Sequence, residues 1–223
     1  MFVFAQQISI ANQYLAELRD QRTQTDRARF RRNLERLGEL TAYEISRTMA
    51  YQNGTVQTPL APAATQTLLQ QPVLATILRA GLPFHQGFLH VFDQADNAFA
   101  GAYRTAHRSN ELNDNKPDDN EFDIVMEYLS SPDLSGRTLI LIDPMLATGR
   151  SLEQVYHALL RFGTPAQTHI AAAIASPEGV RYVREQMPQC RLWLGAIDHH
   201  LNDHYYIVPG LGDAGDLAFG GKI

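Results

Sequence analysis

Cysteine is almost absent from this chain of 223 residues: Cys190 is the single one, so no internal disulfide can form. We interpret it as a small core residue. No apolar run approaches the ~20 residues that a membrane-spanning helix requires. The first residues, Met1–Ile8, carry no basic lead and do not have the pattern of a signal peptide. We therefore expect a soluble, cytoplasmic protein.

A basic block is also missing, and the formal net charge is −5. Nucleic-acid-binding proteins usually present a basic stripe, because neutralising phosphates supplies much of their affinity. The most basic stretch consists of Arg27, Arg29, Arg31, Arg32 and Arg36. Its helical spacing favours a solvated helix face, with a phosphate-binding patch as the alternative. We expect small-molecule substrates and no nucleic-acid or membrane partner.

The ordinary apolar share of 44% and charged share of 19% indicate one globular domain over residues 1–223. Apolar spacing predicts a helix from Asp26 to about Tyr51, ended by Asn53-Gly54. A connection rich in Pro, Thr and Gln should follow it. Residues 1 to about 60 are therefore interpreted as an N-terminal helical arm.

Strands and helices alternate along the rest of the chain, which predicts an α/β fold with a mostly parallel central sheet flanked by helices. The polar stretch from His107 to Glu121 predicts an exposed flap, a β-hairpin over about 103–128. Ligands in such sheets bind beyond the carboxyl ends of the strands. Strands are predicted over Val73–Leu78, Ala98–Tyr103, Asp123–Tyr128, Thr138–Ile142, His169–Ile174 and Leu192–Ile197.

The segment from Asp143 to Ser151 joins one of these strands to a helix. Its glycine and the helix N-terminus predict an anion pocket, to which Thr148 and Ser151 add hydroxyl donors. Asp143 can accept hydrogen bonds from sugar hydroxyls or face a metal ion. An acid beside a phosphate pocket suits a sugar phosphate, although an ordinary strand–turn–helix corner has the same elements. The Walker ending Gly-Lys-Ser/Thr is absent.

This segment, with Asp143-Pro144 in place of two adjacent acids, resembles the signature of the uracil phosphoribosyltransferases, a branch of the type I phosphoribosyltransferases. Two further segments, Ile77–Leu82 and Tyr206–Asp216, are similar to the pyrophosphate loop and the uracil-binding segment of that family. Ser176–Gly179 also resembles family positions. The resemblance implies the type I phosphoribosyltransferase-like fold with flap and N-terminal arm. It also implies the reaction of uracil with 5-phospho-α-D-ribose 1-diphosphate (PRPP) to give UMP and diphosphate.

The resemblance implies that Arg79 and Arg104 bind and stabilise the departing diphosphate, together with Mg²⁺ carried by PRPP. A strained or cis peptide is predicted at Arg79–Ala80. No direct metal ligand and no general base are assigned, and a homodimer or higher homo-oligomer is expected. The implied PRPP-binding residues are Arg79, Ala80, Gly81, Arg104, Asp143, Pro144, Met145, Leu146, Ala147, Thr148, Gly149, Arg150, Ser151 and Asp213.

The base would be read mainly by backbone groups. The amides of Gly212 and Ala214 can donate to a uracil carbonyl, and the carbonyl of Ile207 can accept from a ring N–H. Asp213 is expected near the ribose and C1 of the donor. The implied catalytic set is therefore Arg79, Arg104, Asp143 and Asp213.

Three positions depart from the family pattern: Arg150 stands where a glycine is usual, and Pro83 and Gln86 follow the pyrophosphate loop. Arginine also occurs at the matching place in related RNA-binding attenuators. A pyrimidine-sensing RNA regulator with weak or no catalysis therefore remains an alternative, as does transfer to another base. The histidine-rich segment Asp198–His204 has the composition of a metal site, which we consider the less favoured interpretation.

Overall fold

In the computed structural model, residues 1–105 and 123–221 are described, with residues 102–105 and 123–125 described by their backbone alone. Within this part of the chain an eight-stranded sheet has the order β1-β10-β9-β7-β4-β5-β6, with β8 beside β9. Its strands are β1 (Phe2–Val3), β4 (Val73–Leu78), β5 (Asp96–Thr105), β6 (Asp123–Ser130), β7 (Thr138–Ile142), β8 (Met145–Leu146), β9 (Gln167–Ala175) and β10 (Arg191–Ile197).

Neighbouring strands are parallel throughout this sheet except for β5 and β6, which are antiparallel. The central strands are continuous apolar runs because both of their faces are covered. The predicted α/β class with a mostly parallel sheet is confirmed. The helices are α1 (Ile10–Arg19), α2 (Arg27–Ser46), α3 (Leu82–Val91), α4 (Arg150–Leu159), α5 (Pro177–Gln186) and α6 (Ala214–Phe219), with short 3₁₀ turns η1 (Phe4–Gln6) and η2 (Leu160–Phe162).

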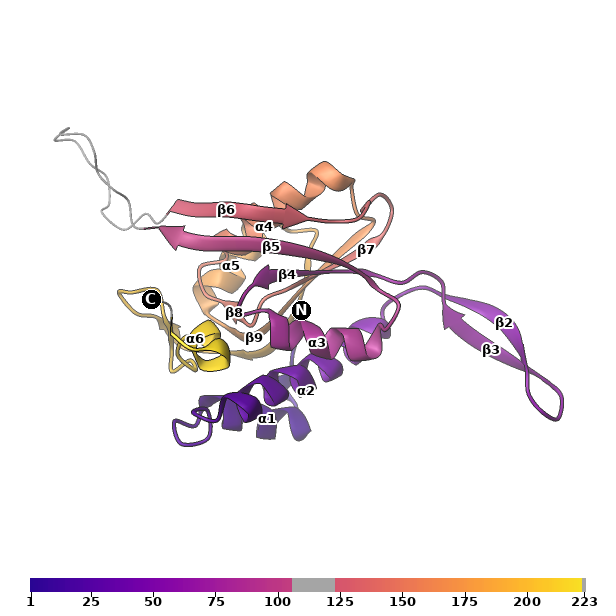
Figure 1. Cartoon of the computed structure of the whole chain (residues 1–223), viewed down its shortest axis with the longest axis horizontal. Helices are drawn as coiled ribbons and strands as arrows, with labels where there is room; N and C mark the ends of the chain where they lie inside the picture. The colour runs from indigo at the N-terminus through magenta and orange to yellow at the C-terminus, as the bar shows by residue number, and fades with distance from the viewer. Residues whose placement is uncertain (106–122, 222–223) are drawn as a thin grey trace.

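The helices form a layer on each face of the sheet (Figure 1). One apolar cluster joins α1, α2, α3 and α6 to the sheet, and includes Phe30, Phe84 and Phe88. The other joins α4 and α5 to the opposite face, through Leu152, Val155 and neighbouring residues. The sheet is therefore held between two apolar layers, and its carboxyl-end edge is left for the loops.

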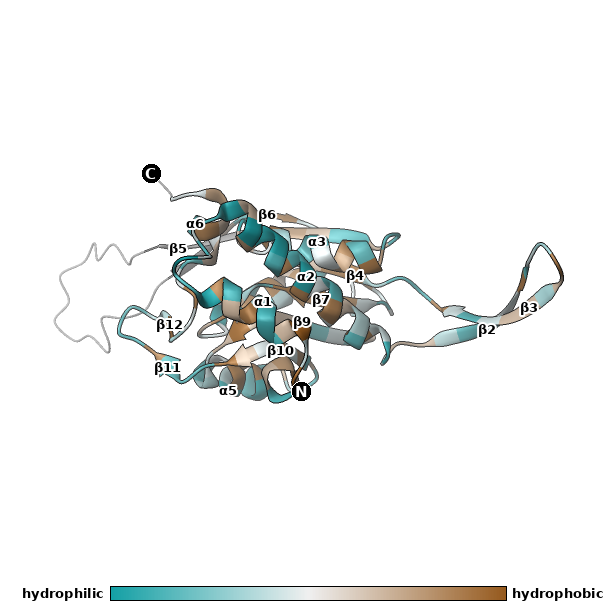
Figure 2. Cartoon of the chain, turned by 90° about the horizontal axis from the view of Figure 1, so that it is seen from below, coloured by the Kyte–Doolittle hydropathy of each residue, from teal (hydrophilic) through white to brown (hydrophobic). Residues whose placement is uncertain are grey.

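The basic stretch of α2 is solvated and paired with acids of the same helical layer. Arg29 Nε lies 2.9 Å from Glu17 Oε2, and Arg32 Nη1 lies 2.8 Å from Glu35 Oε2. The hydrogen bond from Arg29 lowers the pKa of Glu17 to about 2. Figure 2, which looks onto α1 and α2, shows hydrophilic residues along their outer surfaces. These contacts favour the solvated-face interpretation.

The helix predicted from Asp26 to about Tyr51 is α2, and it ends earlier, at Ser46. Asp26 is its N-cap and accepts from the amides of Ala28 and Arg29 (3.0 and 3.1 Å). The prediction that Asn53-Gly54 ends the helix is wrong, because these residues lie inside a strand. The alternation that identifies a strand is absent there, since every residue of that strand is exposed.

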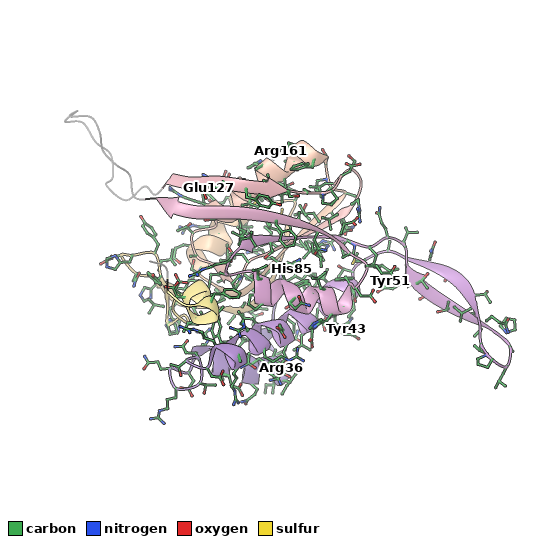
Figure 3. All side chains as sticks on the ribbon, viewed as in Figure 1. Arg36, Tyr43, Tyr51, His85, Glu127 and Arg161 are labelled. Carbon is green, nitrogen blue, oxygen red and sulfur yellow. The ribbon has the colours of Figure 1, made fainter. Side chains whose placement is uncertain are left out.

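That strand is β2 (Tyr51–Gln57), which pairs with β3 (Pro62–Leu68) in an antiparallel hairpin. The connection that was predicted from its Pro, Thr and Gln content is therefore part of this hairpin. We call this hairpin, residues 51–68, the arm. It is not the N-terminal helical arm that was predicted for residues 1 to about 60. The hairpin projects from the body at the end of the molecule opposite α6 (Figure 1). At its root Tyr51 and the nearby Tyr43 of α2 are labelled in Figure 3, and both are exposed, at 48% and 59%.

The strands predicted at the base of the flap are β5 and β6, whose backbones pair up to Thr105 and Asp123. The tip of the predicted flap, residues 106–122, lies outside the described residues. No helix within the described part of the chain is both long enough and apolar enough to cross a membrane.

Candidate active site

Segments far apart in the sequence meet at the carboxyl-end edge of the sheet and enclose a cavity of about 560 Å³. They follow β4 and β7, or belong to the hairpin of β11 (His200–Leu201) and β12 (Ile207–Val208) and the start of α6. The cavity is lined by Ile77, Leu78, Arg79, Ala80, Asp143, Met145, Ala147, Thr148, Gly149, Ser151, Leu152, His204, Tyr205, Tyr206, Ile207, Gly212, Asp213, Ala214 and Gly215.

Residues 143–151, the phosphate loop, lead from β7 through β8 to α4. Two of the loop's carbonyl groups are turned away from the cavity: Leu146 O accepts from Ser176 N (2.9 Å) and Ala147 O accepts from Ser176 Oγ (2.6 Å). Gly149 precedes α4 as its N-cap and has no side chain that could cap the helix. The amide of Arg150 donates to Thr148 Oγ1 at a long 3.4 Å. The start of α4 therefore directs its positive dipole end to the cavity without the two carbonyl oxygens that Ser176 binds, as an anion requires.

Glycine is required at two places for this arrangement. Gly149 has φ +81°, a left-handed conformation that other residues rarely adopt. Gly179, in the first turn of α5, lies so close to the loop that a Cβ would be 2.2 Å from Ala147 O. Helix α5 thus packs directly against the backbone of the phosphate loop.

Tyr182 completes this support from α5. A Cβ at Gly149 would lie 3.0 Å from its ring, and its hydroxyl donates to Glu153 of α4 at 2.6 Å. That hydrogen bond raises the pKa of Tyr182, so the phenol stays protonated as a donor. The loop is therefore fixed between α4 and α5.

Arg150 is the first residue of α4, and its side chain is exposed and does not line the cavity. Among the described residues other than glycine, positive φ occurs at Tyr205 and not at Arg150. The backbone of Arg150 is therefore in an ordinary helical conformation. The positive φ falls on Gly149 instead. Arginine in place of the usual glycine is accommodated without backbone strain.

Asp143 lines the cavity at the end of β7, half-buried, with Oδ1 accepting from the amide of Met145 at 3.3 Å. Pro144 and Leu146 are buried beneath the loop and do not reach the cavity surface. The carbonyl of Pro144 accepts from the amides of Ala173 and Ile174 (3.1 and 3.0 Å) in β9. Of the predicted loop residues, these two support the site from below.

The loop after β4 contains a cis peptide at Leu78–Arg79, so the prediction of Arg79–Ala80 is wrong by one bond. Arg79 and Ala80 line the cavity, whereas Gly81 is the N-cap of α3 and its amide donates to Ile77 O at 3.0 Å. Pro83 occupies the first turn of α3, where a proline is tolerated.

Gln86, the third departure, is exposed on α3, and its Nε2 lies 3.2 Å from His90 Nε2. Neither Pro83 nor Gln86 lines the cavity. These two departures from the family pattern therefore lie on α3, outside the cavity lining.

The side chain of Arg79 reaches the far end of the chain. Its Nη2 donates to Asp216 Oδ1 at 2.8 Å and to the carbonyl of Gly220 at 2.7 Å. The other arginine assigned to the diphosphate, Arg104, lies in β5 opposite Ile124, and its side chain is outside the described residues. Only Arg79 can therefore be placed relative to the cavity.

The base segment, residues 207–216, turns sharply through a cis peptide at Val208–Pro209 and positive φ at Gly210 and Gly212. Asp213 is the N-cap of α6, with Oδ1 accepting from Asp216 N at 2.9 Å. Ile207, Gly212, Asp213 and Ala214 all line the cavity. The structure thus brings the predicted base residues together with the phosphate loop.

Asp198 of the histidine-rich segment is buried and bound in the structure. Its Oδ2 accepts from Arg19 Nη1 at 2.8 Å and from the amide of Gly210 at 2.7 Å. Arg19 also donates to the carbonyl of Gly210 at 3.1 Å. This acid therefore joins α1 to the base segment, and no cluster of three potential ligands that could hold a metal occurs among the described residues.

The predicted site residues did not include three adjacent residues that line the cavity, His204, Tyr205 and Tyr206, although Tyr206 begins the segment that resembles the uracil-binding motif. They belong to a turn in which Asn202 Oδ1 accepts from the amides of His204 and Tyr206 (3.0 and 2.9 Å). Asn202-Asp203 between two short strands is a turn signal that could have identified this wall of the site.

Fold and site together define the class of protein: a phosphate loop, an arginine-bearing loop and a glycine-rich segment meet at the carboxyl edge of a parallel sheet, as in a phosphoribosyltransferase. The family model described as uracil phosphoribosyltransferase matches residues 5–221. The chain belongs to the uracil phosphoribosyltransferase family, and the assignment made from its motifs is confirmed.

Relatives match over nearly the whole chain. The uracil phosphoribosyltransferase of Porphyromonas gingivalis is 52% identical over 216 residues, covering 96% of this chain and 95% of its own. That of Pyrococcus furiosus is 38% identical over 214 residues, covering 94% and 85%. The solved structure of the AQ2163 protein from Aquifex aeolicus superposes with a TM-score of 0.83 at 28% identity, covering 96% of both chains.

Proposed function

We propose that this protein transfers the phosphoribosyl group of PRPP to uracil, giving UMP and diphosphate. Membership of the family supports this reaction. The observation that carries the assignment of residues is the cavity of about 560 Å³ that the phosphate loop, the loop after β4 and the base segment line together. Such a volume accommodates a small ligand with its reacting partner.

In the donor half, the loop from Ala147 to Ser151 would bind the 5′-phosphate and Asp143 would accept from the ribose hydroxyls. Arg79, with the backbone of Ala80, would bind the diphosphate, and Arg104 would join it from β5. Guanidinium groups suit this role because they remain charged and present forked donors. Charge that builds on the departing diphosphate would be stabilised there.

In the acceptor half, the amides of Gly212 and Ala214 would donate to a uracil carbonyl and the carbonyl of Ile207 would accept from a ring N–H. Cytosine would leave one of these backbone groups unpaired in the complex, which costs affinity. Asp213 would lie near C1 of the ribose. Much of the acceleration would then come from holding the two reactants in position.

Magnesium is proposed to enter with PRPP. Asp143 and Asp213 are the carboxylates among the cavity-lining residues. Such a sparse set fits Mg²⁺, which takes one or two carboxylates and completes its shell with phosphate oxygens and water. Bound there, the ion would neutralise negative charge on the diphosphate.

We also propose a homodimer or higher homo-oligomer, formed through the arm. A two-stranded hairpin alone is marginally stable in water. All of β2 is exposed, as are Leu60 (96%) and Leu69 (57%) beside the strands. A second copy covering this surface would stabilise it. A cytoplasmic location suits the reaction, because a multiply charged donor does not cross a bilayer unaided.

A panel of nucleobases offered with PRPP and Mg²⁺, with diphosphate release as the readout, tests the reaction. We expect product with uracil and little with cytosine. Product with another base and none with uracil would overturn the base assignment but leave the donor site. No product with any base, combined with tight and strongly salt-dependent RNA binding, would instead support the regulator.

A further inference from the structure

The ion pair between Arg79 and Asp216 joins the two halves of the cavity. Arg79 follows β4, whereas Asp216 lies in the first turn of α6. Besides Asp216 Oδ1 at 2.8 Å, Nη2 of Arg79 binds the carbonyl of Gly220 at 2.7 Å. One nitrogen of the guanidinium is thus held by the helix that begins at the base segment.

Asp216 is also connected to that segment through its backbone. Its amide donates to Asp213 Oδ1 at 2.9 Å, so Asp213 and Arg79, which both line the cavity, are bound to the same residue. Asp216 itself does not line the cavity. Its contacts can therefore set the spacing of cavity residues without any contact to a substrate.

The same contacts fix the rest of the Arg79 guanidinium. Nε is buried and has no hydrogen-bond partner among the described residues, so it is not the part that a ligand reaches. The side chain is nevertheless 34% exposed. Because the guanidinium is planar and rigid, fixing Nη2 also fixes the direction of its exposed edge, which can donate to an oxygen of a bound diphosphate.

We propose that Asp216 is a positioning residue, which holds the guanidinium of Arg79 in the orientation that receives the diphosphate of PRPP. This inference rests on the proposed donor role of Arg79. A purely structural role is disfavoured, because the two side chains are 34% and 44% exposed and such pairs contribute little to folding stability. Orientation before binding removes an ordering cost from donor binding.

Steady-state kinetics of Asp216→Ala, Asp216→Asn, Arg79→Ala and the double variant Arg79→Ala/Asp216→Ala test the proposal. We expect Asp216→Ala to raise KM for PRPP about tenfold, within the usual range of coupling between contacting residues, and to change kcat less. Asp216→Asn keeps an oxygen acceptor and should recover most of the loss. The double variant should be no worse in kcat/KM for PRPP than Arg79→Ala.

Asp96→Ala is the matched control, because Asp96 forms a comparable ion pair with Arg137 at the opposite edge of the sheet, with side chains 57% and 18% exposed. It should leave KM for PRPP unchanged. Unaltered kinetics of Asp216→Ala, or independent losses that multiply in the double variant, would overturn the role of Asp216 while Arg79→Ala remained impaired. Normal kinetics of Arg79→Ala would instead remove the proposed donor role of Arg79, and the inference with it.

Discussion

The phosphate loop and the base segment line the same cavity but are held by different kinds of contact. The phosphate loop bonds through its backbone to a buried neighbour, with Leu146 and Ala147 both bound by Ser176, which is 0% exposed. The base segment packs into the apolar cluster through Ile207, Leu211 and Ala214 and is in addition held by two ion pairs, Asp198 with Arg19 and Asp216 with Arg79. The phosphate loop therefore depends on backbone contacts with a buried serine, whereas the base segment also depends on charged side chains.

This difference separates two requirements of the reaction. In the proposed assignment, the donor would be bound by backbone groups whose positions follow from the packing of β9 and α5, so they should tolerate little change. The base would be read by a segment whose ion pairs lie partly at the surface, where charges are screened by salt. Changes behind the phosphate loop should therefore damage donor binding most. Of the two ion pairs, Asp198–Arg19 should affect uracil, whereas Asp216–Arg79 also involves a residue proposed to bind the donor.

The largest effect is expected from Gly179→Ala. Its Cβ would lie 2.2 Å from Ala147 O, a backbone atom, so the phosphate loop must shift. Displacements of about 1 Å in an active site can cost about 100-fold, and we expect a loss of that order in kcat/KM for PRPP. Gly54→Ala in the arm is the matched control, because its nearest neighbour would be 3.9 Å away. If kcat/KM for PRPP of Gly179→Ala were close to the parent value, the phosphate loop would not be as rigid as its backbone contacts with Ser176 suggest.

An intermediate effect is expected from Asp198→Ala. The change leaves the buried amide of Gly210 without its acceptor and Arg19 without its carboxylate. Loss of a buried partner costs about 1–3 kcal/mol, so KM for uracil should rise about tenfold. KM for PRPP should change much less. Asp203→Ala, at an exposed position of the same segment, serves as the control. An equal rise in both KM values would contradict the separation of the two halves.

The smallest effect is expected from Arg150→Gly, which restores the residue usual in the family. The side chain is exposed and outside the cavity lining, so its contribution to donor affinity should be small. KM for PRPP should stay within about threefold of the parent value, as expected for a surface change at a helix terminus. A tenfold loss would place Arg150 among the phosphate ligands.

The sequence predicted the parts of the molecule in which local pattern and burial agree. Continuous apolar runs identified β4 and β7, because strands covered on both faces leave a distinct signal. The phosphate loop was predicted from its glycine and hydroxyl residues, and Thr148, Gly149 and Ser151 do line the cavity. Local chemistry was sufficient there because the loop and its helix are consecutive in the chain.

Features that depend on distant partners could not be predicted in this way. Nothing near Arg79 indicates that it binds Asp216, which is separated from it by 137 positions. Asp198 lies in a segment that has the composition of a metal site, yet its carboxylate is bound by Arg19 of α1. The arm was missed because β2 is exposed along its whole length and so carries no apolar period.

The position of the base segment along the chain has a consequence for synthesis. Every strand of the central sheet is complete by Ile197, whereas the base wall of the cavity comes from residues 204–215. Translation adds residues from the N-terminus onward, so the proposed base wall is the last part of the cavity to be synthesised. The sheet and the phosphate loop that it joins precede it in the chain.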